Sequence, residues 1–336
     1  MPSPLSILVV GVGSIGERHL RCFQQAVHCE LGLVEAMESR RNEVADRYGV
    51  AARYATLDEA CRRSWDAAVI CTPANLHVEH ALQLLPVCRG LLIEKPLATK
   101  LEDAARLRVA AGEKLIQVAY VYRVHPAVEA VRNLILSSEI GTVLQVVATS
   151  GQHFPTFRPA YREIYYKDRR TGGGAIQDAM THIANAVQYL VGPYDWVFCD
   201  YAHQCLEGVE VEDTVNLSGR AGDGKIMVSI AMNQFMAANE SRIQINGSRG
   251  SARIELPEHR YGVIHHGETT WTWSPPQLHE RDEWFQIQAR RFVEALEGRE
   301  APTCPLIEAE HTLRVNLAAL ESAGERRVQI PRTATV

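Results

Sequence analysis

Residues 5–16 read LSILVVGVGSIG, and this stretch decides the fold of the first part of the chain. Residues 5–10 form an apolar run rich in branched side chains, which is typical of a strand buried on both faces of a parallel sheet. A glycine turn follows at once, and residues 14–26 have the length and composition of a helix. When a strand, a glycine turn and a helix follow one another, the free backbone N–H groups at the start of the helix point toward a bound pyrophosphate. The stretch therefore predicts a dinucleotide site. The residues expected to contact the dinucleotide here are Gly11, Gly13, Ser14, Ile15 and Gly16.

A second short apolar run, residues 31–34, ends at Glu35. A carboxylate about 20 residues after a glycine fingerprint accepts hydrogen bonds from the adenosine ribose hydroxyls. This favours NAD over NADP, because a 2′-phosphate would meet a like charge. Arg40 and Arg41 either offset that charge or form the solvated face of the next helix. The sequence therefore predicts NAD as the cofactor, with NADP as the less favoured alternative.

Short apolar runs alternate with helical segments as far as about residue 125, which predicts a doubly wound parallel sheet. Two polar segments, residues 72–75 (TPAN) and 94–96 (EKP), follow apolar runs directly. In open sheets of this kind ligands bind at the carboxyl ends of the strands, so both segments are expected at the cofactor site. The further residues assigned to the cofactor are Thr72, Pro73, Asn75, His77, Glu94 and Lys95.

After a helical stretch at residues 126–138 the pattern changes to longer segments that alternate apolar and polar residues. These segments predict a mostly antiparallel sheet, with one face on helices such as residues 178–191 and the other open to a partner subunit. The predicted division is a Rossmann domain at residues 1–124 and an α+β domain for substrate binding and oligomerisation at residues 125–336. We expect a homodimer or homotetramer formed through this sheet. The alternating segments are residues 213–218, 225–233, 241–246 and 251–256.

Three consecutive glycines, residues 172–174, precede Asp178 and His182. Residues four apart lie on one face of a helix, and the glycines allow the start of that helix to come close to a ligand or another backbone segment. An imidazole that titrates near neutrality is suited to take the proton of an alcohol while a hydride leaves its carbon, so His182 is the predicted general base. Lys95 would stabilise the developing alkoxide by its charge, and a deprotonated Lys95 is the alternative base.

Together these motifs resemble those of the glucose-fructose oxidoreductase, inositol dehydrogenase and rhizopine-catabolism family (Gfo/Idh/MocA) over nearly the whole chain. The matching pieces are the fingerprint, Thr72-Pro73 with His77, Glu94-Lys95-Pro96-Leu97-Ala98, Arg123-x-His125-Pro126, Ile140-Gly141, and the triple glycine with Asp178 and His182. The resemblance implies a Rossmann domain joined to an α/β domain with a large open sheet. It also implies NAD(P)-dependent hydride transfer at a secondary alcohol or ketone of a sugar, sugar acid or cyclitol.

The chain departs from the family pattern at Val121 and Asn185, where an amide and an acidic residue are common, and at residues 179–181, where a glycine is common. These changes leave the identity of the substrate open. The residues expected to contact the substrate are Tyr120, Tyr122, Arg123, Tyr161, Arg162 and Tyr165. Such residues supply hydroxyls, an aromatic wall and a cation for an acidic substituent. For the last three the alternative is a loop packed at a subunit interface, and Arg123 alternatively anchors the junction of the domains.

Two further functions use the same fold. One is a glycoside hydrolase that oxidises a sugar hydroxyl transiently, eliminates the glycosidic substituent and returns the hydride. The other is a non-catalytic sensor that binds NAD, a sugar and a protein partner. Loss of Lys95 or His182 would be expected in such a sensor, and this chain keeps both.

The composition narrows the class of protein. A chain of 336 residues suits two domains, and a net charge of −5 with scattered basic residues gives no reason to expect a nucleic-acid partner. No apolar run is long enough to span a membrane, and the first run lacks the features of a secretory signal. The eight cysteines are dispersed, as expected in a reducing cytoplasm. No metal site is predicted, since His77 and His80 have no third ligand nearby in the sequence.

Overall fold

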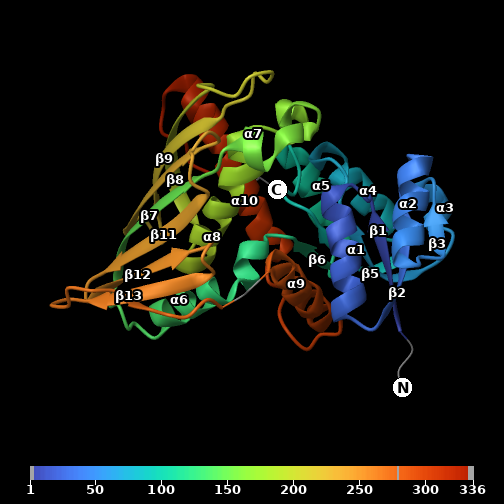
Figure 1. The fold of residues 1–336 in the computed structure, drawn as a ribbon, viewed down its shortest axis with the longest axis horizontal. Coiled ribbons are helices and arrows are strands. Elements are labelled where there is room, and N and C mark those ends of the chain that lie inside the picture. The colour runs from blue at the N-terminus through green and yellow to red at the C-terminus, as the bar shows by residue number, and fades with distance from the viewer. Residues whose placement is uncertain (1–3, 278–279, 332–336) are drawn as a thin grey trace. The chain divides into compact units, whose positions relative to one another are not determined.

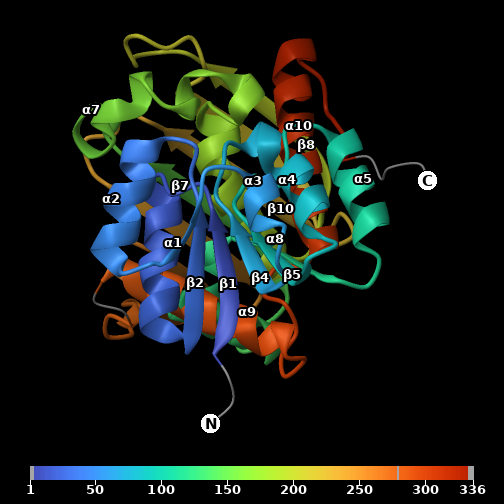
Figure 2. The ribbon, with the colours of Figure 1, turned by 90° about the vertical axis from the view of Figure 1, so that its right-hand side faces the viewer.

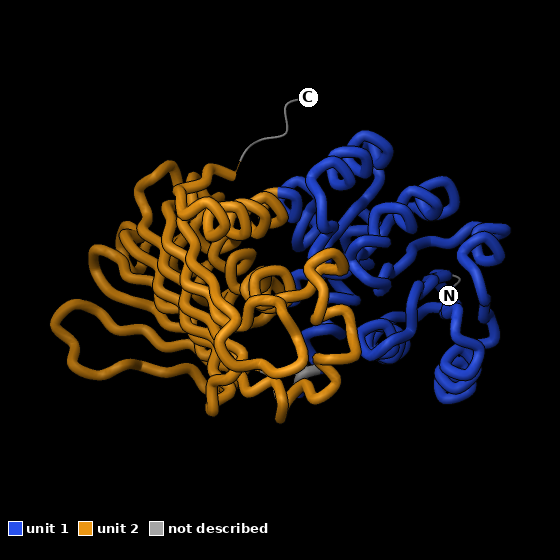
Figure 3. The backbone as a smooth tube through the Cα atoms, turned by 90° about the horizontal axis from the view of Figure 1, so that it is seen from above, with its two compact units in different colours: residues 1–121, 280–310 blue, residues 122–279, 311–336 orange. Residues whose placement is uncertain are grey.

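The computed structural model describes residues 4–277 and 280–331, and the chain forms two compact units (Figure 3). The first unit comprises residues 1–121 and 280–310, and the second comprises residues 122–279 and 311–336. The division into domains at residue 124 stays a prediction. No helix within the described residues has the length and apolar character that crossing a membrane requires.

The first unit is built on a six-stranded parallel sheet with the strand order β3-β2-β1-β4-β5-β6, in which β2, β1, β4 and β5 run side by side in Figure 2. Residues 7–9 of β1 have no exposed surface, because neighbouring strands and helices cover them. The predicted doubly wound parallel sheet is confirmed. The strands are β1 (Leu5–Val10), β2 (Cys29–Val34), β3 (Ala52–Tyr54), β4 (Trp65–Ile70), β5 (Cys88–Ile93) and β6 (Leu115–Val118). The helices are α1 (Ser14–Ala26), α2 (Glu38–Tyr48), α3 (Leu57–Ala60), α4 (His77–Leu84), α5 (Leu101–Ala111) and α9 (Arg281–Leu296).

Helix α9 belongs to the core of this first unit although it lies far along the chain. Ala289, Phe292 and Val293 are spaced so that they share one helical face, and all three are buried in the same cluster as Phe23 of α1. The rings of Phe23 and Phe292 meet edge to face with their centroids 6.3 Å apart. The sequence between β1 and β6 therefore does not complete the hydrophobic core of the Rossmann unit by itself.

The second unit is built on an eight-stranded sheet with the order β14-β13-β12-β11-β7-β10-β9-β8 (Figure 1). Only the β7–β10 pair is parallel among the described pairs, so the prediction of a mostly antiparallel sheet is confirmed. The strands are β7 (Val143–Gly151), β8 (Tyr194–Ala202), β9 (Thr214–Ala221), β10 (Ile226–Asn233), β11 (Glu240–Gly247), β12 (Gly250–Glu255), β13 (Arg260–His265) and β14 (Thr272–Trp273). Its inner face packs on side chains from α6 (Pro126–Leu136), α8 (Thr181–Val191) and the second part of α10 (Leu306–Glu325).

The segment between β7 and α8 folds into short helical turns rather than an extended loop. Its apolar side chains form a small core of their own, in which Phe154, Tyr161 and Tyr166 pack together. Figure 1 shows this segment around the label α7. The turns are α7 (Phe154–Phe157) and the 3₁₀ segments Pro159–Arg162, Tyr165–Lys167 and Arg169–Thr171.

The helix that carries Asp178 differs from the prediction at its start. A π-helical turn, Ile176–Met180, precedes α8, whereas the sequence predicted a regular helix from residue 178. The first amides of the segment are held elsewhere: Ala175 N–H donates to the Glu212 carbonyl (2.9 Å), and Ile176 N–H donates to the Glu212 carboxylate (3.1 Å). Widened turns of this kind often occur at functional sites.

Candidate functional site

The glycine turn of the first unit has the shape that a pyrophosphate group requires. A Cβ added to Gly16 would lie 1.8 Å from the carbonyl oxygen of Gly11, so only glycine allows α1 to start so close to β1. Gly13 caps α1 without a side chain, and a Cβ there would meet nothing nearer than a guanidinium nitrogen of Arg40 at 3.9 Å. The space around a Cβ at Gly13 is therefore open, as expected where a phosphate binds beside a helix N-terminus.

Glu35 lies beside this turn, at the end of β2. Its carboxylate accepts a hydrogen bond from the amide of Val12 (3.2 Å) and another from the amide of Met37 (3.1 Å). A carboxylate has about four lone-pair positions, so it retains acceptor capacity for ribose hydroxyls. Arg41 donates to the backbone carbonyl of Glu35 (2.8 Å) and so holds the chain after β2. Arg40, in contrast, reaches toward the glycine turn.

The segment after β4 lies against the glycine turn. A Cβ on Gly11 would come within 3.1 Å of the Thr72 methyl group, while Pro73 and Asn75 are exposed in the next turn. His77 is buried and lies within hydrogen-bond distance of the carbonyls of Thr72 (2.7 Å) and Pro96 (3.0 Å). Burial lowers the pKa of His77 from its ordinary value. The imidazole thus lies between the ends of β4 and β5, and in its neutral form it donates its single N–H to one of the two carbonyls.

Glu94 and Lys95 follow β5 at the same edge of the sheet. Glu94 is buried, and its carboxylate lies 2.7 Å from the Nε2 atom of His19 and accepts the Lys95 amide at 3.1 Å. Burial by itself raises the pKa of Glu94, but the hydrogen bond from His19 and the positive charges nearby hold that pKa below its ordinary value. The carboxylate is therefore charged at neutral pH. The sequence did not point to His19.

In the second unit, Asp178 and His182 lie in the π turn and the first turn of α8. Asp178 is only 4% exposed, and its carboxylate accepts a hydrogen bond of 2.6 Å from the Tyr165 hydroxyl. His182 is half-buried, with its ring 5.0 Å from that of Tyr122. Tyr165 thus contacts Asp178, and Tyr122 contacts His182, within the second unit.

Three of the other residues predicted to contact substrate are held in the interior of their own unit. Tyr120 is 1% exposed, and Tyr161 is 2% exposed with its hydroxyl donating to the carbonyl of Glu207 (2.8 Å). Arg123 is buried and donates to Asn185 (2.7 Å), with its guanidinium over the ring of Tyr189. Both of these contacts of Arg123 lie within the second unit, and its substrate contact stays a prediction.

Arg162 is exposed and lies against the same tyrosine. Its Nε atom donates to the Tyr161 hydroxyl (3.0 Å), and its guanidinium is 3.5 Å from the carboxylate of Glu207. An exposed guanidinium in a surface pair keeps most of its hydration, so this contact adds little stability. Arg162 thus remains accessible to an acidic group.

Glu212 is a further residue of this site that sequence reasoning missed. Its carboxylate is buried, accepts Arg169 Nε (2.8 Å) and the Ile176 amide (3.1 Å), and lies where a side chain on Gly174 would be. Glu212 therefore ties the loop and the π turn to the start of β9. The sequence signal is the acidic pair Glu212-Asp213 before an apolar strand, but a buried acid cannot be distinguished from a surface one by pattern alone.

Replacing Glu212 by Gln should loosen the segment that carries Asp178. The charged acceptor of the Ile176 amide and of Arg169 is lost in this variant. Hydrogen bonds to charged groups each contribute about 1.5–3 kcal/mol to stability. Because Arg169 is half-exposed, we expect a loss of local stability at the lower end of this range. Hydrogen exchange measured by mass spectrometry should be faster in residues 165–180 of Glu212→Gln. The control is Glu210→Gln, an exposed acid on the same segment. Equal exchange in the two variants would contradict the anchoring role.

Comparison with known proteins agrees with this geometry. Residues 5–122 match the family model of oxidoreductases with an NAD-binding Rossmann fold (GFO_IDH_MocA), and residues 128–253 match the C-terminal domain of the same family. The chain is 30% identical over 269 residues, 76% of either chain, to dTDP-3,4-didehydro-2,6-dideoxy-alpha-D-glucose 3-reductase of Saccharopolyspora spinosa. It is 27% identical to inositol 2-dehydrogenase 3 of Saccharopolyspora erythraea, over 54% of this chain and about half (52%) of that relative.

The fold is also that of solved structures. A levoglucosan dehydrogenase in complex with NADH and levoglucosan superposes with a TM-score of 0.89 at 20% identity, over 98% of this chain and all of the other. An oxidoreductase domain protein from Kribbella flavida gives a TM-score of 0.88 at 22% identity, over 99% of this chain. From the family match and the relative at 30% identity, this chain belongs to the Gfo/Idh/MocA family of oxidoreductases with an NAD-binding Rossmann fold.

Proposed function

We propose that this chain moves a hydride between NAD and a secondary alcohol or ketone of a sugar, sugar acid or cyclitol. The observation that carries the proposal is the buried Asp178 carboxylate one helical turn before the half-buried imidazole of His182, in a chain that also has the open space above Gly13. Relatives named as inositol 2-dehydrogenase and 1,5-anhydro-D-fructose reductase support the substrate class.

The first unit supplies the groups that hold the cofactor. The amides at the start of α1 and the open space above Gly13 suit its pyrophosphate, and the Glu35 carboxylate suits the adenosine ribose. When bound, the nicotinamide accepts or donates the hydride. Lys95 is fixed at its backbone by Glu94, and its ammonium stabilises the negative charge that develops on the substrate oxygen.

The second unit supplies the base. In the direction of oxidation, His182 takes the proton of the substrate hydroxyl as the hydride leaves the same carbon, so that a ketone and a protonated imidazole result. The nearby negative charge of Asp178 stabilises that imidazolium, and the Tyr165 hydroxyl holds the Asp178 carboxylate in place. In the direction of reduction, His182 returns the proton to the oxygen. Because Tyr165 donates to Asp178, we assign it to positioning as well as to the substrate contact that the sequence predicted.

Incubation with NAD and a panel of sugars, sugar acids, cyclitols and aryl glycosides tests the reaction. Wild-type protein should form NADH with at least one alcohol, and Lys95→Ala and His182→Ala should lower that rate about a hundredfold or more, since each removes a group that acts on the transferred proton or charge. His266→Ala, on an exposed histidine, is the control and should keep the rate. Release of the aryl group without NADH would instead show redox-neutral hydrolysis.

Glu35 should set the preference for NAD. In Glu35→Ser the like charge facing a 2′-phosphate is gone, so the ratio of the NADP to the NAD dissociation constant should fall by about tenfold, or about 1.4 kcal/mol. Calorimetric titration of both dinucleotides measures the ratio. Glu38→Ser, on an exposed acid of α2, should leave the ratio unchanged. If Glu35→Ser also leaves it unchanged, the assignment of Glu35 to the ribose is wrong.

The outer face of the second sheet supports the proposal of a homo-oligomer. Val147, Ser229, Ser218 and Phe198 form one row across β7, β10, β9 and β8, and the two apolar members are more than one-third exposed. Met227, on the same sheet, is 52% exposed. Exposed apolar side chains among polar ones on a sheet face are favourable to cover with a second copy.

Light scattering after size exclusion tests this assembly. Wild-type protein should have at least twice the mass of one chain, and the double variant Val147→Asp with Met227→Asp should shift toward the mass of one chain, because two charges would be desolvated in the interface. Leu136→Asp, on an exposed position of α6, is the control. A wild-type mass equal to one chain would rule out the proposal.

A further inference from the structure

A buried histidine of α1 lies directly against the acid that precedes Lys95. His19 is 1% exposed, and its Nε2 atom is 2.7 Å from Oε1 of Glu94. The other oxygen of Glu94 accepts the amide of Lys95 at 3.1 Å. A single carboxylate thus links the helix that follows the glycine turn to the backbone of Lys95.

The contacts around His19 indicate which nitrogen carries its proton. Among the described residues, Nδ1 of His19 is buried without a hydrogen-bond partner. A bare ring nitrogen costs less there than a buried N–H without an acceptor, and a carboxylate requires a donor. The Nε2 atom of His19 therefore donates its proton to the Glu94 carboxylate and holds that carboxylate in place.

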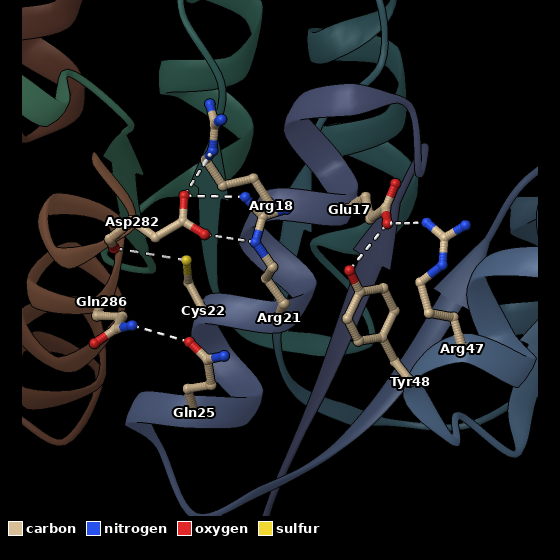
Figure 4. A network of polar contacts seen from close by, with 9 residues as sticks. All are labelled: Glu17, Arg18, Arg21, Cys22, Gln25, Arg47, Tyr48, Asp282 and Gln286. Atoms are coloured by element: carbon tan, nitrogen blue, oxygen red, sulfur yellow. Dashed lines mark hydrogen bonds and ion pairs between the residues drawn. The ribbon is translucent and has the colours of Figure 1, made fainter. Parts of the chain in front are cut away.

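Helix α9 keeps water away from this pair. The ring of Phe285 meets His19 edge-on with centroids 5.4 Å apart, and the guanidinium of Arg18 lies 5.2 Å from the same ring. Figure 4 shows how α9 is held: the carboxylate of Asp282 accepts from Arg18 at 3.0 Å and from Arg21 at 2.5 and 3.0 Å. Exclusion of water strengthens the hydrogen bond between His19 and Glu94.

From these contacts we propose that His19 is a positioning residue for the reaction: it fixes the Glu94 carboxylate, which in turn fixes the backbone of Lys95 and keeps a negative charge beside it. This inference rests on the proposed function, in which Lys95 stabilises the substrate oxygen by its charge.

The test compares His19→Leu, which removes the donor, with His19→Gln, whose side-chain amide keeps a donor at the same distance from Cα. Glu17→Gln is the matched control, because it loosens the attachment of α1 to Arg47 and Tyr48 of α2 while α9 and the contact between His19 and Glu94 stay. For each variant, kcat and KM on the best substrate of the panel, the NAD dissociation constant, and the hydrogen exchange of the Lys95 amide are measured.

We expect His19→Leu to lower kcat by about ten- to hundredfold, because small misplacements of a reacting group cost this much. The NAD dissociation constant and KM should change less than about threefold, exchange at the Lys95 amide should be faster, and His19→Gln should restore most of kcat. In a Glu94→Gln background His19→Leu should add little further loss, since both variants break the same contact.

Three results would overturn the inference: a kcat for His19→Leu within twofold of wild type, an equal loss in His19→Gln and His19→Leu, or the same losses in Glu17→Gln, which would indicate general loosening of α1. If wild-type protein turns over no substrate, the proposed function has failed instead. The inference is then decided by the Lys95 amide alone, and unchanged exchange in His19→Leu overturns it.

Discussion

The rest of the first unit depends on the close approach between Gly16 and the carbonyl oxygen of Gly11, where a side chain would lie only 1.8 Å from that oxygen. This approach lets α1 begin at Ser14, within a few residues of the end of β1. Once α1 lies there, its following turns place His19 against Glu94 and Phe23 in the core. One steric constraint therefore sets the helix end that faces the cofactor, the anchor of Lys95 and the packing of the unit.

Buried carboxylates accept hydrogen bonds from backbone amides at several loops of the structure. Glu94 holds the Lys95 backbone, Glu212 holds the π turn, and Asp213 accepts the amides of residues 204–206 at 2.7–2.9 Å. Burial by itself raises the pKa of Asp213, and these amides hold that pKa below its ordinary value. Each acid compensates its lost hydration by several hydrogen bonds. Rigid loops of this kind suit chemistry that requires groups to be held in place.

Sequence reasoning reached the features that depend on neighbouring residues. Residues 5–16 predicted the first strand, the glycine turn and the helix. Short apolar runs that alternate with helical segments predicted the parallel sheet, and segments that alternate apolar and polar residues predicted the antiparallel sheet, because this periodicity indicates which face of a strand is buried. The packing partners of α9 could not be predicted from the sequence. Its apolar face indicates a helix, but no pattern of neighbouring residues indicates that Phe292 packs on Phe23. The π turn before α8 depends on Glu212, a residue more than thirty positions away. Tyr161 was predicted at the substrate, and no pattern distinguishes that role from the core position it occupies.

Two glycines of the fingerprint have different roles in the proposed function: Gly13 leaves room for a ligand, whereas Gly16 allows the close approach of α1 to β1. A side chain at Gly13 would meet only Arg40, at an ordinary contact distance of 3.9 Å, so Gly13→Ala should fold with a melting temperature within a few degrees of wild type, because the poorer N-cap is offset by the lower entropy of the unfolded chain. Calorimetric titration with NAD should nevertheless show wild-type binding and an affinity at least about tenfold weaker in Gly13→Ala, because the methyl group occupies the space that a pyrophosphate needs. Equal affinity for NAD in wild-type protein and Gly13→Ala would contradict this role of Gly13.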